Sequence, residues 1–305
     1  MKILNFGSLN IDKVYQVDNF VRPGETISSK NLNFFCGGKG LNQSIALAKA
    51  GADVWHAGCI GNDGQMLSDA LQDSQVRLDF LKTLDMPTGH ALIQVSQTGQ
   101  NCIILFGGAN QAISREQIDE TLSHFDQGDI LLLQNEINNL PYLVDQAYQK
   151  GMTIFLNPSP ITEQLKEIDL SKISYLVLNE IEAADLSDVT AHNPQDYADI
   201  LLKKYPSCHI LLTMGTAGSI YLDHQTHHAQ SAFKVQAVDT TAAGDTYTGY
   251  FIAAIARGAD VQAAMKEASM ASAISVTRNG ASTSIPERKE VLESLCVYPT
   301  KTRHF

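Results

Sequence analysis

The sequence predicts an α/β protein built on a mostly parallel β-sheet, and three observations support this prediction. Short apolar runs recur through the middle of the chain, at Ile130–Leu133, Thr153–Leu156, Tyr175–Leu178 and His209–Thr213. These runs do not alternate with polar residues, which is typical of parallel strands buried on both faces. Helical stretches such as Leu140–Lys150 separate them, and polar residues follow each run. Because ligands bind at the carboxyl ends of parallel strands, we expect a functional site at that edge.

Length, charge and cysteine content exclude several classes of function. The 305 residues are 44% hydrophobic and 18% charged, which suffices for a large core, and we expect one domain over residues 1–305. The net charge of −11 disfavours nucleic acid and anionic membranes as partners. The five cysteines are scattered without a CxxC pair, and no apolar run is long enough to span a membrane. Asn5 and Gly7 come too early for a signal peptide, so we expect a cytoplasmic protein.

The N-terminal part of the chain predicts one buried strand and two exposed hairpins. The strand spans Lys2–Phe6, and the turn after it contains Asn10 and Asp12, which either form an Asx turn or contact a ligand. The hairpins pair Val14–Val17 with Ile27–Phe35, and His90–Ser96 with Asn101–Phe106. Together, strands from about residues 12–36 and 88–107 are expected to form a small sheet that covers a cleft.

A glycine-rich segment opens a helix after the first hairpin. Gly37, Gly38 and Gly40 surround Lys39 at the start of a helix that ends near Gly51. The segment is not a Walker loop, because Lys39 is not followed by Ser or Thr and the glycine spacing differs. Three glycines at a helix start indicate that a polar group approaches the backbone there, as either a ligand contact or a packing turn.

A run of small residues opens a second helix, with Asp245 at its start. Free backbone N–H groups of Ala243, Gly244 and Asp245 at this N-terminus form a pocket for an anion. In the functional interpretation, Asp245 takes a proton from a hydroxyl group while these N–H groups stabilise a phosphoryl group in transfer. The alternative is that Asp245 merely caps the helix, although Thr240 and Thr241 are also available as caps.

Two other clusters have simple structural explanations. His224, His227 and His228 have a spacing that suits zinc, but their Gln- and Thr-rich surroundings favour a surface hairpin next to Ser219–Leu222. The segment Val276–Ser282 follows a helix of small residues, and by itself it reads as a C-terminal loop with a solvated arginine.

Several separated motifs occur in one order along the chain. The most specific are Gly37-Gly38-Lys39-Gly40-x-Asn42-Gln43, Asn179-x-x-Glu182 and Asp239-Thr240-x-Ala242-Ala243-Gly244-Asp245. Others are Gly7-Ser8-x-Asn10-x-Asp12, Pro23–Thr26, Gly108–Asn110 and Thr277–Ala281. Together they resemble the signatures of the ribokinase-like carbohydrate kinases over nearly the whole chain.

The resemblance implies a doubly wound, mostly parallel sheet with helices on both faces and a small β-sheet lid. The implied reaction transfers the γ-phosphoryl group of ATP to a sugar hydroxyl. Asp245 would be the general base, and the anion hole would be formed by Ala242, Ala243 and Gly244. The expected partners are a small sugar and ATP, and the chain is expected to form a homodimer through the lid.

The resemblance also assigns the binding residues. Those expected to hold the sugar are Asn10, Asp12, Gly38, Lys39, Gly40, Asn42, Glu136 and Asp245. Those expected to bind the nucleotide are Asn179, Thr213, Gly215, Gly218 and Gly244. Glu182 would place Mg²⁺ through water, and the K⁺ loop would comprise Asp239, Thr241, Ser275, Arg278, Gly280 and Ser284.

Four positions depart from the family pattern: Ile11, Leu41, Met66 and Phe106. Bulkier residues at Ile11, Leu41 and Phe106 are expected to alter the wall of the sugar pocket, and Met66 stands where a glycine is usual. The resemblance implies ribose as the substrate, and these departures leave fructose, deoxyribose or a nucleoside as the alternative. A third hypothesis is a sensor that binds a sugar or nucleotide without catalysis, against which an intact Asp245 argues.

Overall fold

The computed structural model describes residues 1–189 and 193–298, and within them nine strands form one large sheet in the order β13-β12-β11-β10-β9-β8-β1-β4-β5. The strands are β1 (Ile3–Phe6), β4 (Val54–Gly61), β5 (Arg77–Leu84), β8 (Ile130–Gln134), β9 (Thr153–Asn157), β10 (Tyr175–Asn179), β11 (His209–Thr213), β12 (Ser219–Leu222) and β13 (His227–Gln230). All neighbours from β5 to β11 pair in parallel, whereas β12 and β13 are antiparallel. The mostly parallel sheet is confirmed, and so is the hairpin that contains His227 and His228.

Helices cover both faces of this sheet, because alternate residues of each strand enter two separate cores. Leu131 and Leu133 pack towards α3 (Arg115–Leu122), α4 (Leu140–Gln149), α5 (Glu180–Ser187) and α6 (Pro194–Lys204). Ile130 and Leu132 pack towards α1 (Lys39–Lys49), α2 (Gln65–Asp73), α7 (Ala243–Ala256), α8 (Val261–Ser275) and α9 (Arg288–Val297). Short 3-10 helices occur at Gly108–Gln111, Glu163–Glu167, Leu170–Lys172, Gly215–Ala217 and Ser282–Ser284. The doubly wound arrangement is therefore confirmed.

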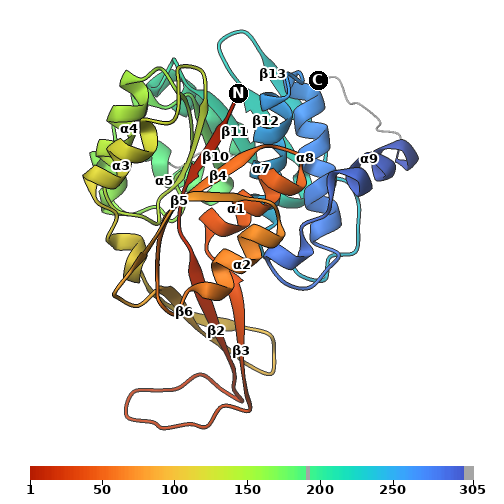
Figure 1. Cartoon of the computed structure of the whole chain (residues 1–305). Helices are drawn as coiled ribbons and strands as arrows, with labels where there is room; N and C mark the ends of the chain where they lie inside the picture. Colours follow the sequence, from red (N-terminus) through yellow and green to blue (C-terminus); the bar gives the residue numbers. More distant parts are fainter. Residues whose placement is uncertain (190–192, 299–305) are drawn as a thin grey trace.

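A second sheet projects from the body of the molecule (Figure 1). Its strands follow the order β3 (Asn31–Gly37), β2 (Asn10–Gln16), β6 (Gly89–Val95) and β7 (Asn101–Phe106). Both expected hairpins are present, but β2 begins at Asn10 instead of Val14 because Asn10 pairs with both Gly37 and Gly89. This pairing carries β2 back to the edge of the large sheet.

The order of the central strands creates a reversal point in the large sheet. From β1 the chain proceeds to β4 and β5 on one side, and then returns to β8 and β9 on the other. A crevice forms where neighbouring strands send their connections in opposite directions, which here is at the carboxyl ends of β1 and β8. No helix in residues 1–189 and 193–298 is long and apolar enough to cross a membrane.

Candidate active site

Glycines bring the N-terminus of α1 against the turn after β1. A Cβ on Gly40 would lie 2.3 Å from the backbone N of Ser8, and one on Gly38 would lie 2.9 Å from Ser8 O. Gly38 also has φ 94°, which favours glycine. Leu41 N–H donates to Ser8 O at 3.0 Å and fixes the contact. The glycine-rich segment therefore packs backbone on backbone at the carboxyl end of β1.

The start of α7 has backbone donors without a side-chain cap. Ala242 adopts a left-handed conformation (φ 59°), and no side chain caps the helix. Thr240 and Thr241 were available as caps, but neither side chain caps the helix. Ala243 N–H donates to Thr240 O at 3.2 Å, whereas the N–H groups of Gly244 and Asp245 have no acceptor among the described residues. Two donors thus remain available to an anion.

The Asp245 carboxylate is buried, with 8% of its surface exposed, and is held by two amides of α1. Asn42 Nδ2 donates to Oδ2 at 3.0 Å, and Gln43 Nε2 donates to Oδ1 at 2.8 Å. Its side chain therefore does not cap α7. The contacts join residues that are about 200 positions apart, and they result from the packing of α1 on α7.

Three charged side chains surround the space next to Asp245. Glu136 accepts hydrogen bonds from Lys39 N–H at 3.1 Å and from the Ser8 hydroxyl. Burial and the neighbouring Glu136 raise the pKa of Asp12 to about 6. Burial acts to lower the pKa of Lys39, but the carboxylates of Asp245, Glu136 and Glu182 outweigh it and raise that pKa. The lysine is thus held as a cation among acceptors.

Asn110 orients the predicted ligand contact Asn10. Asn110 Nδ2 donates to Asn10 Oδ1 at 2.8 Å, and Asn110 Oδ1 accepts from Leu9 N–H at 3.0 Å. Gly89 leaves room for this pair, because a Cβ there would lie 2.1 Å from Asn110 Nδ2. The sequence analysis gave Asn110 no role, although it belongs to one of the motifs.

A cavity of about 1350 Å³ lies beside the start of α7. Thr213, Gly215, Gly218 and Gly244 line it, as the resemblance implies for nucleotide-binding residues. A wall of this cavity that was not predicted from sequence is formed by α8 and the segment before α7. The wall residues are Phe233, Lys234, Ala263, Lys266, Ser269 and Ala273. The feature of the sequence that could have indicated this wall is the run of small residues in α8, which leaves room for a ligand beside the helix.

Asn179 and Glu182 form a capping box at the start of α5. Asn179 Oδ1 accepts from Glu182 N–H at 2.9 Å, and Glu182 Oε2 accepts from Asn179 N–H at 3.0 Å. Neither residue lines the cavity described above. Glu182 already accepts from protein donors on both oxygens, and the described residues contain no group of three or more His, Cys, Asp or Glu side chains that could hold a metal. The residues fit a hydrated Mg²⁺ better than a directly coordinated one.

The predicted K⁺ loop consists of two segments joined by Asp239. Its carboxylate accepts from Thr241 N–H at 2.9 Å and from Gly280 N–H at 3.0 Å. The hydroxyls of Ser275 and Ser284 are buried and donate to backbone carbonyls, whereas the Arg278 guanidinium pairs with Glu290. Carboxylate and carbonyl oxygens suit a hard monovalent cation, so the donor set fits, with Arg278 able to contribute only backbone.

The four departures from the family pattern lie in different surroundings. Leu41 and Ile11 are buried in the core formed with α1 and α7, and Met66 packs against the same core. Leu41 is 0% exposed and Ile11 is 5% exposed, so any effect of these two residues on the pocket wall would be indirect. Phe106 is 48% exposed on β7, and its ring lies 5.0 Å from the ring of His90 in a tilted arrangement.

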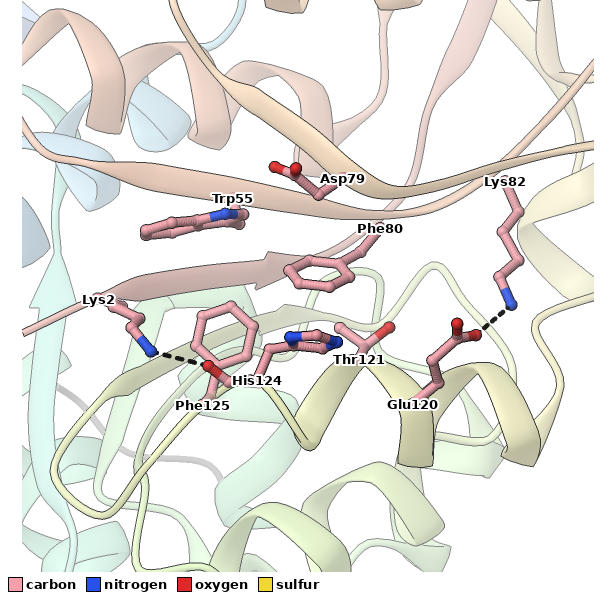
Figure 2. Close-up of a pocket in the computed structure, with 9 residues that line it drawn as sticks. All are labelled: Lys2, Trp55, Asp79, Phe80, Lys82, Glu120, Thr121, His124 and Phe125. Carbon is pink, nitrogen blue, oxygen red and sulfur yellow. Dashed lines mark hydrogen bonds and ion pairs between the residues drawn. The ribbon is translucent and has the colours of Figure 1, made fainter.

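A second hollow lies beside the amino ends of β1 and β4, the middle of β5 and the end of α3 (Figure 2). Trp55, Phe80 and Phe125 form its walls, and on its rim Lys82 pairs with Glu120 at 2.7 Å. None of the residues that line it is a predicted site residue.

Known proteins are similar to this chain in sequence and in fold. The family model for pfkB family carbohydrate kinases matches residues 1–288. The ribokinase of Haemophilus influenzae is 35% identical over 95% of this chain and 96% of its own length. The structure of ribokinase from Cryptococcus neoformans in complex with ADP superposes with a TM-score of 0.87 at 33% identity, covering 96% of this chain and 99% of that one. Ribokinase of Arabidopsis thaliana, complexed with ribose and ATP, gives 0.86 at 29% identity, with coverage of 96% and 98%. The chain therefore belongs to the pfkB family of carbohydrate kinases.

Proposed function

We propose that this carbohydrate kinase transfers the γ-phosphoryl group of ATP to D-ribose and forms D-ribose 5-phosphate. The observation that carries the proposal is the position of Asp245, a buried carboxylate beside uncapped backbone donors of α7. The proposed nucleotide cavity reaches Gly244, next to this carboxylate. On the other side of the carboxylate lie side chains that can accept hydrogen bonds from sugar hydroxyls, such as Glu136. The names of the similar proteins support ribose as the acceptor.

The sugar would bind between β2, the start of α1 and the turn after β8. Asn10, Asp12 and Glu136 offer acceptors for sugar hydroxyls, and the glycines Gly38 and Gly40 let the sugar approach the backbone. Asn42 has a particular reason to belong to this set. Its Oδ1 is buried without a hydrogen-bond partner among the described residues, while its Nδ2 donates to Asp245. A sugar hydroxyl that donates a hydrogen bond to Asn42 Oδ1 would satisfy this atom.

Asp245 would remove the proton of the attacking hydroxyl. The sugar oxygen forms a bond to the γ-phosphorus, the bond to the ADP oxygen breaks, and the proton ends on the Asp245 carboxylate. The backbone at Ala242, Ala243 and Gly244 would stabilise the transferred group, chiefly through the free N–H groups of Gly244 and Asp245. The cationic Lys39 would add to the same stabilisation.

Two cations belong to the proposal. Mg²⁺, placed through water by Glu182, would neutralise phosphate charge. A bound K⁺ would fix the loop that leads into α7. Its ligands would be oxygens of Asp239, Thr241, Ser275, Arg278, Gly280 and Ser284. Hydrogen bonds from Val238 and Asp239 N–H to Val276 O already tie the two segments together. Turnover that is independent of added K⁺ would contradict this part.

The small sheet would act as a lid on one domain that spans residues 1–305, and two lids would meet in a homodimer. Its strands expose large apolar side chains, including Phe34, Phe35, Ile103, Ile104 and Leu105. Contiguous exposed apolar surface of this kind marks an interaction site. A cytoplasmic location suits the five cysteines, which are all free thiols.

An ADP-release assay with ATP, Mg²⁺ and K⁺ tests the substrate. The panel comprises ribose, deoxyribose, fructose and a nucleoside, each over a range of concentrations. We expect the highest kcat/KM for ribose. A higher value for another member would keep the kinase and replace ribose, and the first variant to make would then be Phe106→Ala. Binding of ribose without turnover of any sugar would favour the sensor hypothesis.

A further inference from the structure

We propose that Gln43 is a positioning residue for catalysis, which holds the Asp245 carboxylate in its productive orientation, and that Gln134 holds Gln43. The proposal rests on the proposed function, because it gives Gln43 a task only if Asp245 acts as the base. Gln43 is fully buried at 0% exposure, so it acts through Asp245 without touching sugar or nucleotide.

Gln43 lies at the centre of a buried chain of amides. Its Nε2 donates to Asp245 Oδ1 at 2.8 Å, and its Oε1 accepts from Gln134 Nε2 at 2.7 Å. Gln134 Nε2 also donates to Asn5 Oδ1 at 3.0 Å. On the other side, Gln43 Nε2 lies 3.3 Å from Asn157 Oδ1. Residues from β1, β8, β9, α1 and α7 thus meet at one point.

Backbone carbonyls at both ends of the chain fix the direction of every amide. Asn157 Nδ2 donates to Val177 O at 2.9 Å, so its oxygen faces Gln43, which must therefore present its NH₂ group. At the other end, Asn5 Nδ2 donates to Gly40 O at 2.8 Å, and its oxygen accepts from Gln134. Carbonyls and the Asp245 carboxylate only accept, so turning any one amide over would oppose two acceptors or two donors. The network has one self-consistent arrangement.

This arrangement places a preorganised donor on one oxygen of the base and Asn42 on the other. A donor to the charged form of a carboxylate favours that form and restricts its rotation. Lys39 and Glu136 interact with Asp245 through their charges, and among the described residues neither is hydrogen-bonded to it. Gln43 therefore sets the orientation of the Asp245 carboxylate, while Asn42 remains available to the sugar.

The test compares three glutamine variants that each lose one buried amide at nearly constant side-chain length. Gln43→Met removes the donor to Asp245. Gln134→Met removes the group that holds Gln43, together with the hydrogen bond to Asn5, and leaves the donor to Asp245 in place. Gln117→Met is the matched control, because Gln117 is buried on α3 and donates to Gly58 O at 3.0 Å, on the opposite face of the sheet. Steady-state kinetics with ribose and ATP, thermal unfolding and an Asp245→Asn reference complete the set.

We expect Gln43→Met to lower kcat about 10- to 100-fold, with KM for ribose and for ATP changed less than about threefold. Gln134→Met should lower kcat in the same way but less, and Gln117→Met should lower the unfolding temperature while kcat stays within about twofold. A kcat of Gln43→Met within about twofold of wild type would overturn the proposal, and so would a parallel rise in both KM values, which indicates a structural role.

Three further outcomes distinguish a failure of the role of Gln43 from a failure of the proposed base. If Gln43→Met does not fold, Gln134→Met decides, and its full retention of kcat overturns the proposal. If Asp245→Asn turns over ribose at the wild-type rate, the proposed base itself is wrong. If Asp245→Asn is inactive while Gln43→Met is fully active, only the role of Gln43 is wrong.

Discussion

In the proposed sugar site, the pKa of Asp12 is set by its surroundings. Burial and the charge of Glu136 raise the pKa of Asp12 to about 6, and burial also raises the pKa of Glu136. A carboxylate accepts hydrogen bonds from sugar hydroxyls best when it is ionised. Bound sugar therefore favours the ionised form, and protonation of Asp12 competes with sugar binding.

We predict that ribose affinity falls as the pH drops below about 6, by up to tenfold per pH unit, because the protonated site must first lose a proton. Calorimetric titration of ribose between about pH 5 and about pH 8 measures this. Asp12→Asn, which cannot ionise, should bind more weakly at neutral pH but with a flatter dependence. An unchanged pH dependence in Asp12→Asn would assign the effect to Glu136.

The residues expected to face ligands could be proposed from sequence, because they stand in motifs, but the residues that hold these side chains in place could not. Asp245, Asn10 and Asp12 stand in motifs at the ends of strands or at the start of a helix. Gln134 and Asn5 sit in or at the end of apolar strands, and their contacts depend on the order of those strands in the sheet. Nothing local indicates that order.

At the scale of elements, the packing of α1 against α7 positions the base. Gly249 makes this contact possible, since a Cβ there would lie 2.4 Å from Ala46 Cβ and 2.9 Å from Leu47 N. By contrast, no protein atom lies within 4 Å of a Cβ placed on Gly244, which lines the nucleotide cavity. In α7, Gly249 therefore serves the packing against α1, whereas Gly244 serves the proposed ligand cavity.

We predict that Gly249→Ala lowers the free energy of unfolding by about 1–3 kcal/mol and reduces kcat, because overpacking moves α7 away from α1. Gly244→Ala should leave the stability unchanged or slightly higher but weaken ATP turnover, because its methyl group enters the cavity. Denaturant unfolding and steady-state kinetics measure both effects. Equal stability losses in the two variants would contradict this assignment.

Most elements of the large sheet followed from periodicity. The expected strand at His209–Thr213 has the observed bounds, and the other three central strands end within one residue of the expected position. The strands β4 and β5 were missed, because β4 contains His56 and two glycines and β5 carries exposed charged residues. His56 is nevertheless fully buried, and burial lowers its pKa to about 4, which keeps it neutral.

At the scale of the whole molecule, the small sheet leaves both of its edge strands with exposed apolar side chains. Ile104 on β7 is 62% exposed, and Phe34 on β3 is 53% exposed. The parallel pairing of β2 with β6 joins two hairpins that lie far apart in the sequence, which is why the hairpins could be predicted from sequence but their order could not. A second lid is the partner that we propose for this surface.

We predict that wild-type protein has the mass of a dimer in light scattering and that Ile104→Asp has the mass of a monomer, because a buried unpaired carboxylate is costly. Ile181→Asp is the matched control, since Ile181 is 73% exposed on α5, in the body of the molecule. A monomeric wild type would contradict the dimer, and monomerisation by both variants would show an effect that is not specific to the lid.

The most direct test of the proposed mechanism is the initial rate of ADP release by Asp245→Asn with ribose, ATP, Mg²⁺ and K⁺, compared with wild type. Asn keeps the shape of the side chain and removes the base, and thermal unfolding shows whether the variant remains folded. We predict a loss of kcat on the order of 10²–10⁴, with ribose still bound. A folded Asp245→Asn protein that phosphorylates ribose at the wild-type rate would show that Asp245 is not the base.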